Sequence, residues 1–120
     1  MLFRSKPVLS LGEQGSDVGM FKSPVGVAVS NKDEIAVTDH SNHRVQIFNI
    51  NGDFIRSFGR AGINQGEFNY PCGIAFDKDG KIFVADKHNH RVQIFNGEGR
   101  YMGMFGGEGS HDSQLSYPWG

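Results

Sequence analysis

The sequence lacks several features that would assign it to common functional classes. Its 120 residues include a single cysteine, Cys72, so no disulfide bond can form within the chain. No apolar run approaches the roughly 18 residues that a membrane-spanning helix needs. The formal net charge is −1, so no overall electrostatic field would draw the chain to nucleic acid or to a membrane. Binding to RNA would need a local surface, and we expect no membrane partner.

Signals for export and for catalysis are also missing. Residues 1–11 contain basic residues and a short strand-like segment, without the h-region of about 7–15 apolar residues that marks a signal peptide. Together with the single cysteine, this favours a cytoplasmic location. No catalytic triad, P-loop or glycine-rich dinucleotide motif stands in a strand-to-helix context, and no Cys/His cluster has zinc-binding spacing. We expect no catalytic residue, metal or other cofactor in this chain, and no small-molecule substrate.

What the sequence does have is an internal repeat. Residues 12–58 and 59–105 align without a gap at an offset of 47 residues (59 − 12), and 20 of the aligned pairs are identical. The segment Asn-His-Arg-Val-Gln-Ile-Phe-Asn at 42–49 returns at 89–96. A fixed period of about 20–50 residues indicates one supersecondary unit whose copies stack on one another.

Each unit is expected to contain four short strands. In the first copy these are residues 26–29, 34–38, 44–48 and 54–58, where apolar and polar residues alternate or β-branched residues gather. Asn51-Gly52 predicts a tight primed hairpin turn between the third and fourth strands. No stretch keeps a helical apolar period. Four antiparallel strands in each repeat predict an all-β protein, a partial β-propeller of about two four-stranded blades.

The repeat also predicts the domain boundaries. Residues 12–58 and 59–105 are each expected to form one blade, residues 1–11 the lone fourth strand of a preceding blade, and residues 106–120 the leading loop of a truncated third blade. A propeller closes its ring to remove sheet edges, and two blades cannot close it. We therefore expect a fragment of a longer protein, and we expect the isolated chain to self-associate or aggregate.

The repeated residues resemble the NHL repeat. The resemblance rests on Phe-x-x-Pro-x-Gly-hydrophobic-Ala, on hydrophobic-x-Val-x-Asp, and on two in-phase copies of Asn-His-Arg-Val-Gln-Ile-Phe, and it covers the whole chain. The chain is most similar to the C-terminal propellers of tripartite-motif (TRIM-NHL) E3 ubiquitin ligase family proteins. This resemblance implies a six-bladed propeller that binds RNA or protein. It also implies that ligase activity would belong to a RING and B-boxes that this chain does not contain.

The motif residues repeated in both copies are expected to hold the fold together. The acid before each motif could be a ligand or catalytic carboxylate, but its presence in both copies favours a pair with the motif arginine or a bond to the turn backbone. The asparagines are expected to be turn residues that tolerate left-handed φ. These structural repeat residues are Asp39, Asn42, Arg44, Asp86, Asn89 and Arg91.

The histidines allow two interpretations. His40 and His43 are three residues apart and His88 and His90 two apart, which is compatible with metal ligands. However, they fall in loops of separate blades and no cysteine or common carboxylate joins them, whereas zinc normally takes three or four convergent ligands. His43 and His90 are repeated and should pack in the fold. His40 and His88 are not repeated and are better candidates for surface groups.

Functional residues should differ between the copies and lie on one propeller face. The loops between the second and third strands share a face with the loops before Pro24 and Pro71, and the residues there combine cations, an aromatic ring and hydrogen-bond donors. This combination suits single-stranded RNA, although ordinary solvated loops have the same composition. The candidates for an RNA- or partner-binding face are Lys22, His40, Arg60, Tyr70, Lys87 and His88.

Three functions remain open on this evidence. The first is RNA binding as part of a TRIM-NHL-like ubiquitin ligase or translational regulator. The second is recognition of a protein substrate without RNA, which the near-neutral charge favours. The third is a propeller enzyme resembling NHL-like lyases, which would need polar ligands on the first strand of each blade. Residues 27–29 and 74–76 are apolar there, so an enzyme is the least favoured alternative.

Overall fold

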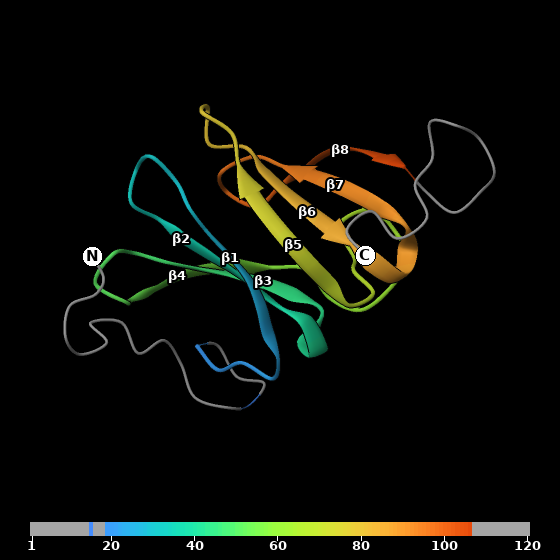
Figure 1. Cartoon of the computed structure of the whole chain (residues 1–120), viewed down its shortest axis with the longest axis horizontal. Helices are drawn as coiled ribbons and strands as arrows, with labels where there is room; N and C mark the ends of the chain where they lie inside the picture. The colour runs from blue at the N-terminus through green and yellow to red at the C-terminus, as the bar shows by residue number, and fades with distance from the viewer. Residues whose placement is uncertain (1–14, 16–18, 107–120) are drawn as a thin grey trace.

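The computed structural model describes residue 15 and residues 19–106, which form two four-stranded sheets (Figure 1). The lone strand predicted at 1–11 lies outside these residues. So does the leading loop predicted at 106–120, apart from Gly106, which ends the last strand.

Both sheets are antiparallel meanders in which neighbours in sequence are neighbours in space. The first sheet has the order β1-β2-β3-β4 and the second the order β5-β6-β7-β8. The strands of the first sheet are β1 (Pro24–Val29), β2 (Ile35–Asp39), β3 (Arg44–Phe48) and β4 (Phe54–Phe58). Those of the second are β5 (Pro71–Phe76), β6 (Ile82–Asp86), β7 (Arg91–Phe95) and β8 (Tyr101–Gly106). The prediction of an all-β partial propeller is confirmed, and each sheet is one blade.

A single turn of 3-10 helix interrupts each blade between its second and third strands. These turns are η1 (His40–Asn42) and η2 (Lys87–Asn89). The residue that follows each turn has left-handed φ, 52° at His43 and 55° at His90. The expectation of left-handed φ at Asn42 and Asn89 is therefore wrong, because the chain reverses one residue later, and the Nδ2 groups of both asparagines donate hydrogen bonds instead.

The hairpin at Asn51-Gly52 also differs from its prediction. A type I′ turn needs positive φ at both central residues and a type II′ turn at the first one, but here Gly52 has φ 90° and Asn51, the first of the two, does not have positive φ. The Asn49 side-chain oxygen accepts hydrogen bonds from the Asn51 and Asp53 backbone N–H groups at 2.9 and 3.0 Å. This side chain organises a longer turn, and the strand register shifts beside it between Ile47 and Phe48.

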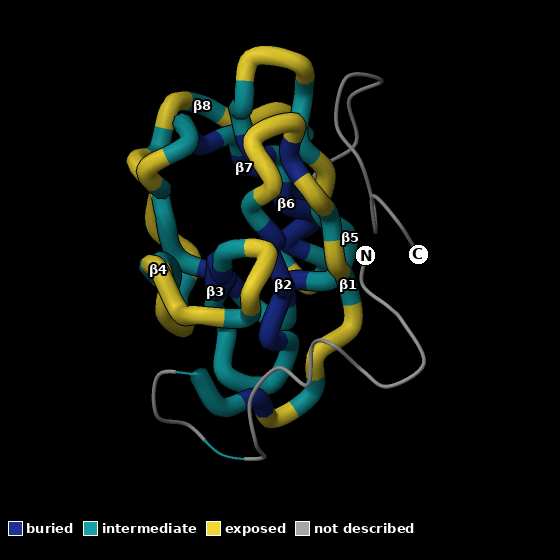
Figure 2. The backbone as a smooth tube through the Cα atoms, turned by 90° about the vertical axis from the view of Figure 1, so that its left-hand side faces the viewer, coloured by how far each residue is buried: buried dark blue, intermediate teal, exposed yellow. Residues whose placement is uncertain are grey.

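The main core lies between the two blades. One face of the first sheet packs against one face of the second, and Phe68, from the loop joining the blades, is fully buried among them. The Phe58 ring reaches across to Phe68 and Phe95, with ring centroids 6.5 and 4.6 Å apart. Buried residues are concentrated in the two middle strands of each blade, and many of the exposed residues lie at the turns (Figure 2). The core therefore joins the blades as well as the strands within each blade.

The blades approach most closely where β1 lies against β5. A Cβ atom at Gly26 would overlap the Cys72 carbonyl oxygen and would lie 2.7 Å from the Thr38 hydroxyl oxygen. That hydroxyl donates a hydrogen bond of 2.6 Å to the same Cys72 carbonyl. The absence of a side chain at Gly26 thus permits the contact between the blades.

Replacing Gly26 should therefore separate the two blades. We expect Gly26→Ala to destabilise the chain by about 1–3 kcal/mol, as overpacking does, in urea unfolding followed by circular dichroism. Gly103→Ala is the matched control, because a Cβ there meets no atom within 4 Å. Equal stability of the two variants would contradict the steric explanation.

Candidate interaction face

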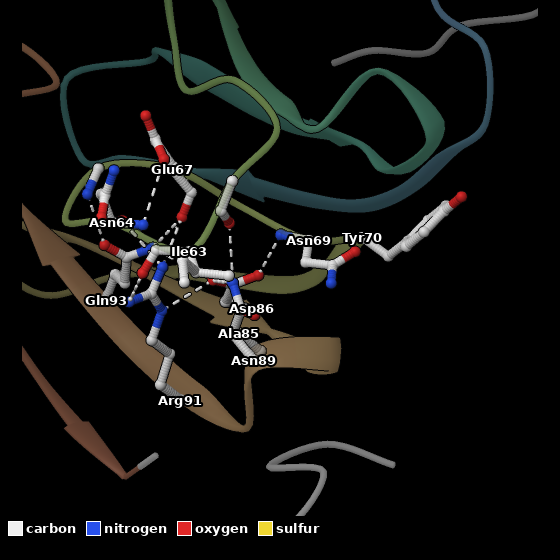
Figure 3. A network of polar contacts seen from close by, with 12 residues as sticks. Ile63, Asn64, Glu67, Asn69, Tyr70, Ala85, Asp86, Asn89, Arg91 and Gln93 are labelled. Carbon is white, nitrogen blue, oxygen red and sulfur yellow. Dashed lines mark hydrogen bonds and ion pairs between the residues drawn. The ribbon is translucent and has the colours of Figure 1, made fainter. Parts of the chain in front are cut away.

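A fully buried carboxylate, Asp86, organises the loop that joins the two blades (Figure 3). Its Oδ1 accepts a hydrogen bond of 2.6 Å from the Asn69 backbone N–H. Its Oδ2 accepts bonds from Asn89 Nδ2 at 2.9 Å and Arg91 Nε at 2.8 Å. The carboxylate thus ties the loop before β5 to both the 3-10 turn and β7.

Arg91 and Gln93 extend this network along the loop backbone. The Arg91 guanidinium donates to three loop carbonyls at 2.8–3.0 Å, those of Ile63, Asn64 and Glu67. Gln93 Nε2 donates to the Glu67 carbonyl at 2.6 Å, and Gln93 Oε1 accepts from the Gly66 N–H at 2.8 Å. These backbone N–H and C=O groups of the loop have no neighbouring strand as a partner, and side chains of β7 form hydrogen bonds with them instead.

The first blade repeats this network with the same residue types. Asp39 Oδ1 accepts from the Lys22 and Ser23 backbone N–H groups at 2.8 and 3.3 Å. Its Oδ2 accepts from Asn42 Nδ2 at 2.8 Å and Arg44 Nε at 3.0 Å. Two loops of different sequence are held in the same way, so the repeated motif positions the loops that differ between the copies.

Neither carboxylate is available to a ligand, because both are buried and both oxygens of each are hydrogen-bonded. Gln46 and Gln93 were not among the residues predicted from the sequence, although both are fully buried and donate hydrogen bonds to loop carbonyls. Their signal was present: a polar residue recurs at the same inward-facing position of an otherwise apolar strand.

At the loop end of the blades, four rings gather at the boundary between the two sheets. Tyr70 lies at its centre, with ring centroids 4.8 Å from His40, 4.6 Å from His43 and 4.9 Å from His88. His40 and His43 come from the first blade, and Tyr70 and His88 from the second. The Tyr70 side chain points away from the Asp86 network (Figure 3). We call these four residues the ring cluster.

The backbone of Tyr70 is held in an unusual conformation. Its φ is 61°, a left-handed value that is uncommon for a bulky residue and persists only where the surroundings hold it. The preceding residue, Asn69, is held by Asp86, and the Tyr70 N–H donates a 3.0 Å hydrogen bond to His43 Nδ1. Since Nδ1 accepts this bond, neutral His43 carries its proton on Nε2. The ring cluster thus depends on contacts from both blades.

Electrostatics in the cluster act on His40. Burial, and then the nearby charges of His88, His43 and Lys87, lower the pKa of His40 below its ordinary value of 6.5. The close approach of three histidines and a lysine thus disfavours an added proton, so His40 is held in its neutral form at neutral pH.

The structure brings together four of the six predicted face residues. His40, Tyr70 and His88 belong to the ring cluster, and Lys87 lies close enough to act on the pKa of His40. Lys22 is exposed and contributes its backbone N–H to Asp39. Arg60, with 81% of its side chain exposed, pairs with Glu67 at 3.0 Å. His43 belongs to the cluster although the sequence placed it in the fold interior.

Within residues 15 and 19–106, no three His, Cys, Asp or Glu side chains are grouped to hold a metal ion. The same residues contain no helix long and apolar enough to cross a membrane.

Removing the charge of Asp86 should destabilise the second blade. Asp86→Asn removes the negative charge that pairs with Arg91, and it can place an NH2 group against the donors of Asn89 and Arg91. We therefore expect the free energy of unfolding, measured with urea, to fall by about 3–5 kcal/mol. Asp79→Asn, at an exposed turn of the same blade, should change stability by less than about 0.5 kcal/mol. Similar effects of both substitutions would contradict the role of the Asp86 network.

The pKa of His40 should be measurable by NMR titration of its imidazole. We expect titration below 6.5, and we expect Lys87→Met to move it upward by removing a nearby positive charge. Because the folded chain resists protonation of His40, its contribution to stability is fully present above 6.5 and is lost as the pH falls through the lowered pKa. A His40 pKa above 6.5 would show that the ring cluster is not packed as described.

Known proteins are similar to this chain over the repeated segments. The NHL repeat profile matches residues 21–48 and 68–95, each spanning a loop and the first three strands of one blade. Protein lin-41 of Caenorhabditis elegans is 43% identical over 49 residues, which are 41% of this chain and 4% of that protein. Protein brain tumor of Drosophila melanogaster is 49% identical over 43 residues, 36% of this chain and 4% of that protein. E3 ubiquitin-protein ligase TRIM32 of Mus musculus is 43% identical over 42 residues, 35% of this chain and 6% of that protein.

Solved structures share the fold at low sequence identity. A Bacteroides fragilis protein described as exported aligns with a TM-score of 0.65 at 20% identity, covering 80% of this chain and 27% of that one. Regucalcin, a calcium-binding protein from Agrobacterium tumefaciens, aligns with a TM-score of 0.52 at 17% identity, covering 70% of this chain and 30% of that one. The predicted resemblance is confirmed: the chain contains two NHL repeats, each the basis of one propeller blade, and it is similar to the NHL repeats of TRIM-NHL proteins.

Proposed function

We propose that this chain is a non-catalytic interaction module that binds single-stranded RNA through the ring cluster and Lys87. The observation that carries the proposal is the packing of Tyr70 between His40 and His88 at the boundary of the two blades. Proteins that bind single-stranded nucleic acid combine aromatic rings, on which bases stack, with cations that track the phosphates. Both are present here within one small area.

The residues of this area suit RNA better than the net charge of the whole chain suggests. The net charge is −1, so attraction of this area to phosphate must come from the Lys87 side chain. The rings of His40 and His88 are tilted by 48° and 46° to Tyr70 and are not stacked parallel to it. A base can therefore meet a ring face without first separating two stacked rings.

The relatives support a proposal about the wider role. The chain spans 4–6% of the length of the curated proteins it matches, so their whole activities belong here only as proposals. TRIM32 is named an E3 ubiquitin-protein ligase. We place this module in a TRIM-NHL-like ubiquitin ligase or translational regulator of the cytoplasm, where it would select the RNA or protein on which the rest of that protein acts.

The proposal is tested by fluorescence anisotropy with random single-stranded RNA oligonucleotides over a range of salt concentrations. Tyr70→Leu should weaken binding by about 1–3 kcal/mol through lost stacking. Lys87→Gln should lower the slope of log K against log salt by roughly 0.7, the value for one phosphate contact on a single strand. Arg60→Gln should have a smaller effect, because Arg60 is paired with Glu67.

The matched control is Lys78→Gln, at the exposed turn between β5 and β6. It removes the same charge at the opposite end of the blade and should leave affinity unchanged. If Lys87→Gln and Lys78→Gln behave alike, RNA binding at this face is contradicted.

Recognition of a protein is the second candidate, and the near-neutral charge of the chain favours it. In that case a partner captured from cell extract would survive nuclease treatment and would be lost with Tyr70→Leu, while the purified chain would not bind the RNA oligonucleotides.

A further inference from the structure

One hydrogen bond between the two blades ends on a titratable acceptor, at the centre of the ring cluster. The Tyr70 N–H of the second blade donates to Nδ1 of His43 in the first blade at 3.0 Å. Other hydrogen bonds between the blades end on backbone carbonyls, those of Cys72, Lys78 and Gly97. A carbonyl oxygen accepts at every pH, whereas an imidazole nitrogen stops accepting once it is protonated.

Both ends of this bond have an uncommon backbone conformation. His43 and Tyr70 have left-handed φ values of 52° and 61°, which cost free energy in residues other than glycine. Tyr70 also precedes Pro71, and the residue before a proline favours an extended backbone. The conformation of Tyr70 therefore needs a contact from outside its own loop, and the bond to His43 supplies one.

The first blade shows a second arrangement of the same loop position. Ser23 stands at the position of Tyr70 (70 − 47) and also precedes a proline. Its N–H donates to Oδ1 of Asp39 at 3.3 Å, and its φ is not left-handed. Asp86 is the equivalent carboxylate of the second blade, and its Oδ1 already accepts from Asn69, the residue before Tyr70. The repeat thus offers the Tyr70 N–H a second acceptor in a different backbone conformation.

The groups around His43 leave a protonated ring without a carboxylate partner. Among the described residues no carboxylate pairs with the His43 ring, and the neighbouring Arg44 is paired with Asp39. Once protonated, His43 carries an N–H on both ring nitrogens, so the Tyr70 N–H would face a donor. The titratable and charged groups of these surroundings are His40 and Arg44 from the first blade and Tyr70, Asp86, Lys87 and His88 from the second.

We infer that His43 is a positioning residue, which holds Tyr70 in the ring cluster while its imidazole is neutral and releases it when the imidazole is protonated. On protonation Nδ1 gains a hydrogen, the Tyr70 N–H loses its acceptor, and it turns to Asp86 Oδ1. The Tyr70 backbone then leaves the left-handed region and its ring leaves the cluster. The effect on RNA binding rests on the proposed function, whereas the hydrogen bond and its titration do not.

The direction of the pH effect separates this switch from simple electrostatics. Protons added to histidines bring positive charge toward the phosphates, so charge alone predicts tighter RNA binding in acid. Release of Tyr70 removes a ring on which a base stacks, so the switch predicts weaker binding in acid.

NMR titration of the ¹⁵N-labelled, unaltered chain tests the switch without RNA. Between about pH 7.5 and about pH 5.5, where histidines titrate, the Tyr70 amide signal should move with the same midpoint as the His43 ring nitrogens. The scalar coupling across the N–H···N bond should be present at the higher pH and absent at the lower one. A Tyr70 amide that does not respond while His43 titrates would overturn the inference, and so would a His43 ring that stays neutral until the chain unfolds.

His43→Asn keeps an acceptor but removes the titration. The Asn Oδ1 is as many bonds from the backbone as Nδ1 of histidine, and asparagine tolerates left-handed φ. In fluorescence anisotropy with single-stranded RNA, the unaltered chain should bind about fivefold more weakly at the lower pH, as expected for the loss of one hydrogen bond. The affinity of His43→Asn should change less than about twofold over the same range.

His90→Asn is the matched control. It makes the same substitution at the same motif position of the second blade, where the backbone is also left-handed, and it should keep the acid response of Tyr70. Circular dichroism establishes that each variant is folded. A His43→Asn chain that keeps the full acid response, or a His90→Asn chain that loses it, would contradict the role of His43. Absence of RNA binding at about pH 7.5 would contradict the proposed function alone, because the NMR titration decides the role of His43 separately.

Discussion

The buried ion pair between Asp86 and Arg91, with its counterpart between Asp39 and Arg44, is the interaction on which the rest of the structure depends. The described residues of the loop before each blade lie outside the named strands, and their backbone groups need partners. The carboxylate binds the end of the loop, and the guanidinium and the neighbouring glutamine bind its carbonyls. Because the loop is held in this way, Phe68 stays in the core between the blades.

The same network places the candidate interaction face. Asn69 is held by Asp86, and Tyr70 follows it with a left-handed φ that His43 of the other blade supports. The ring cluster takes two residues from each blade, so it forms only when the blades are packed together. Stability and recognition are therefore coupled here: a change that loosens the loop also moves the ring to which a ligand would bind.

Several parts of this arrangement could be predicted from particular residues. Alternation over 44–48 predicted β3, and the repeat of its motif predicted β7. The errors have a common cause. Asn42 was expected to reverse the chain, but its side chain is needed by Asp39 and His43 takes the left-handed position. Asn51 was expected in a primed turn, but the Asn49 side chain organises a longer one. In both cases a side-chain hydrogen bond decided between conformations that local preference leaves nearly equal.

The sequence by itself determined the repeat, the class of fold and the set of residues that each blade must share, because periodic burial leaves a pattern that one chain displays directly. It could not decide which of the varying loop residues would meet. His40, Tyr70 and His88 lie 30 and 18 positions apart in sequence (70 − 40 and 88 − 70), and their rings converge because the blades pack with Gly26 against β5. Lys22 and Arg60 carry the same local signals but lie outside the ring cluster. Only the packing of one blade on the next, a contact between distant segments, selected among them.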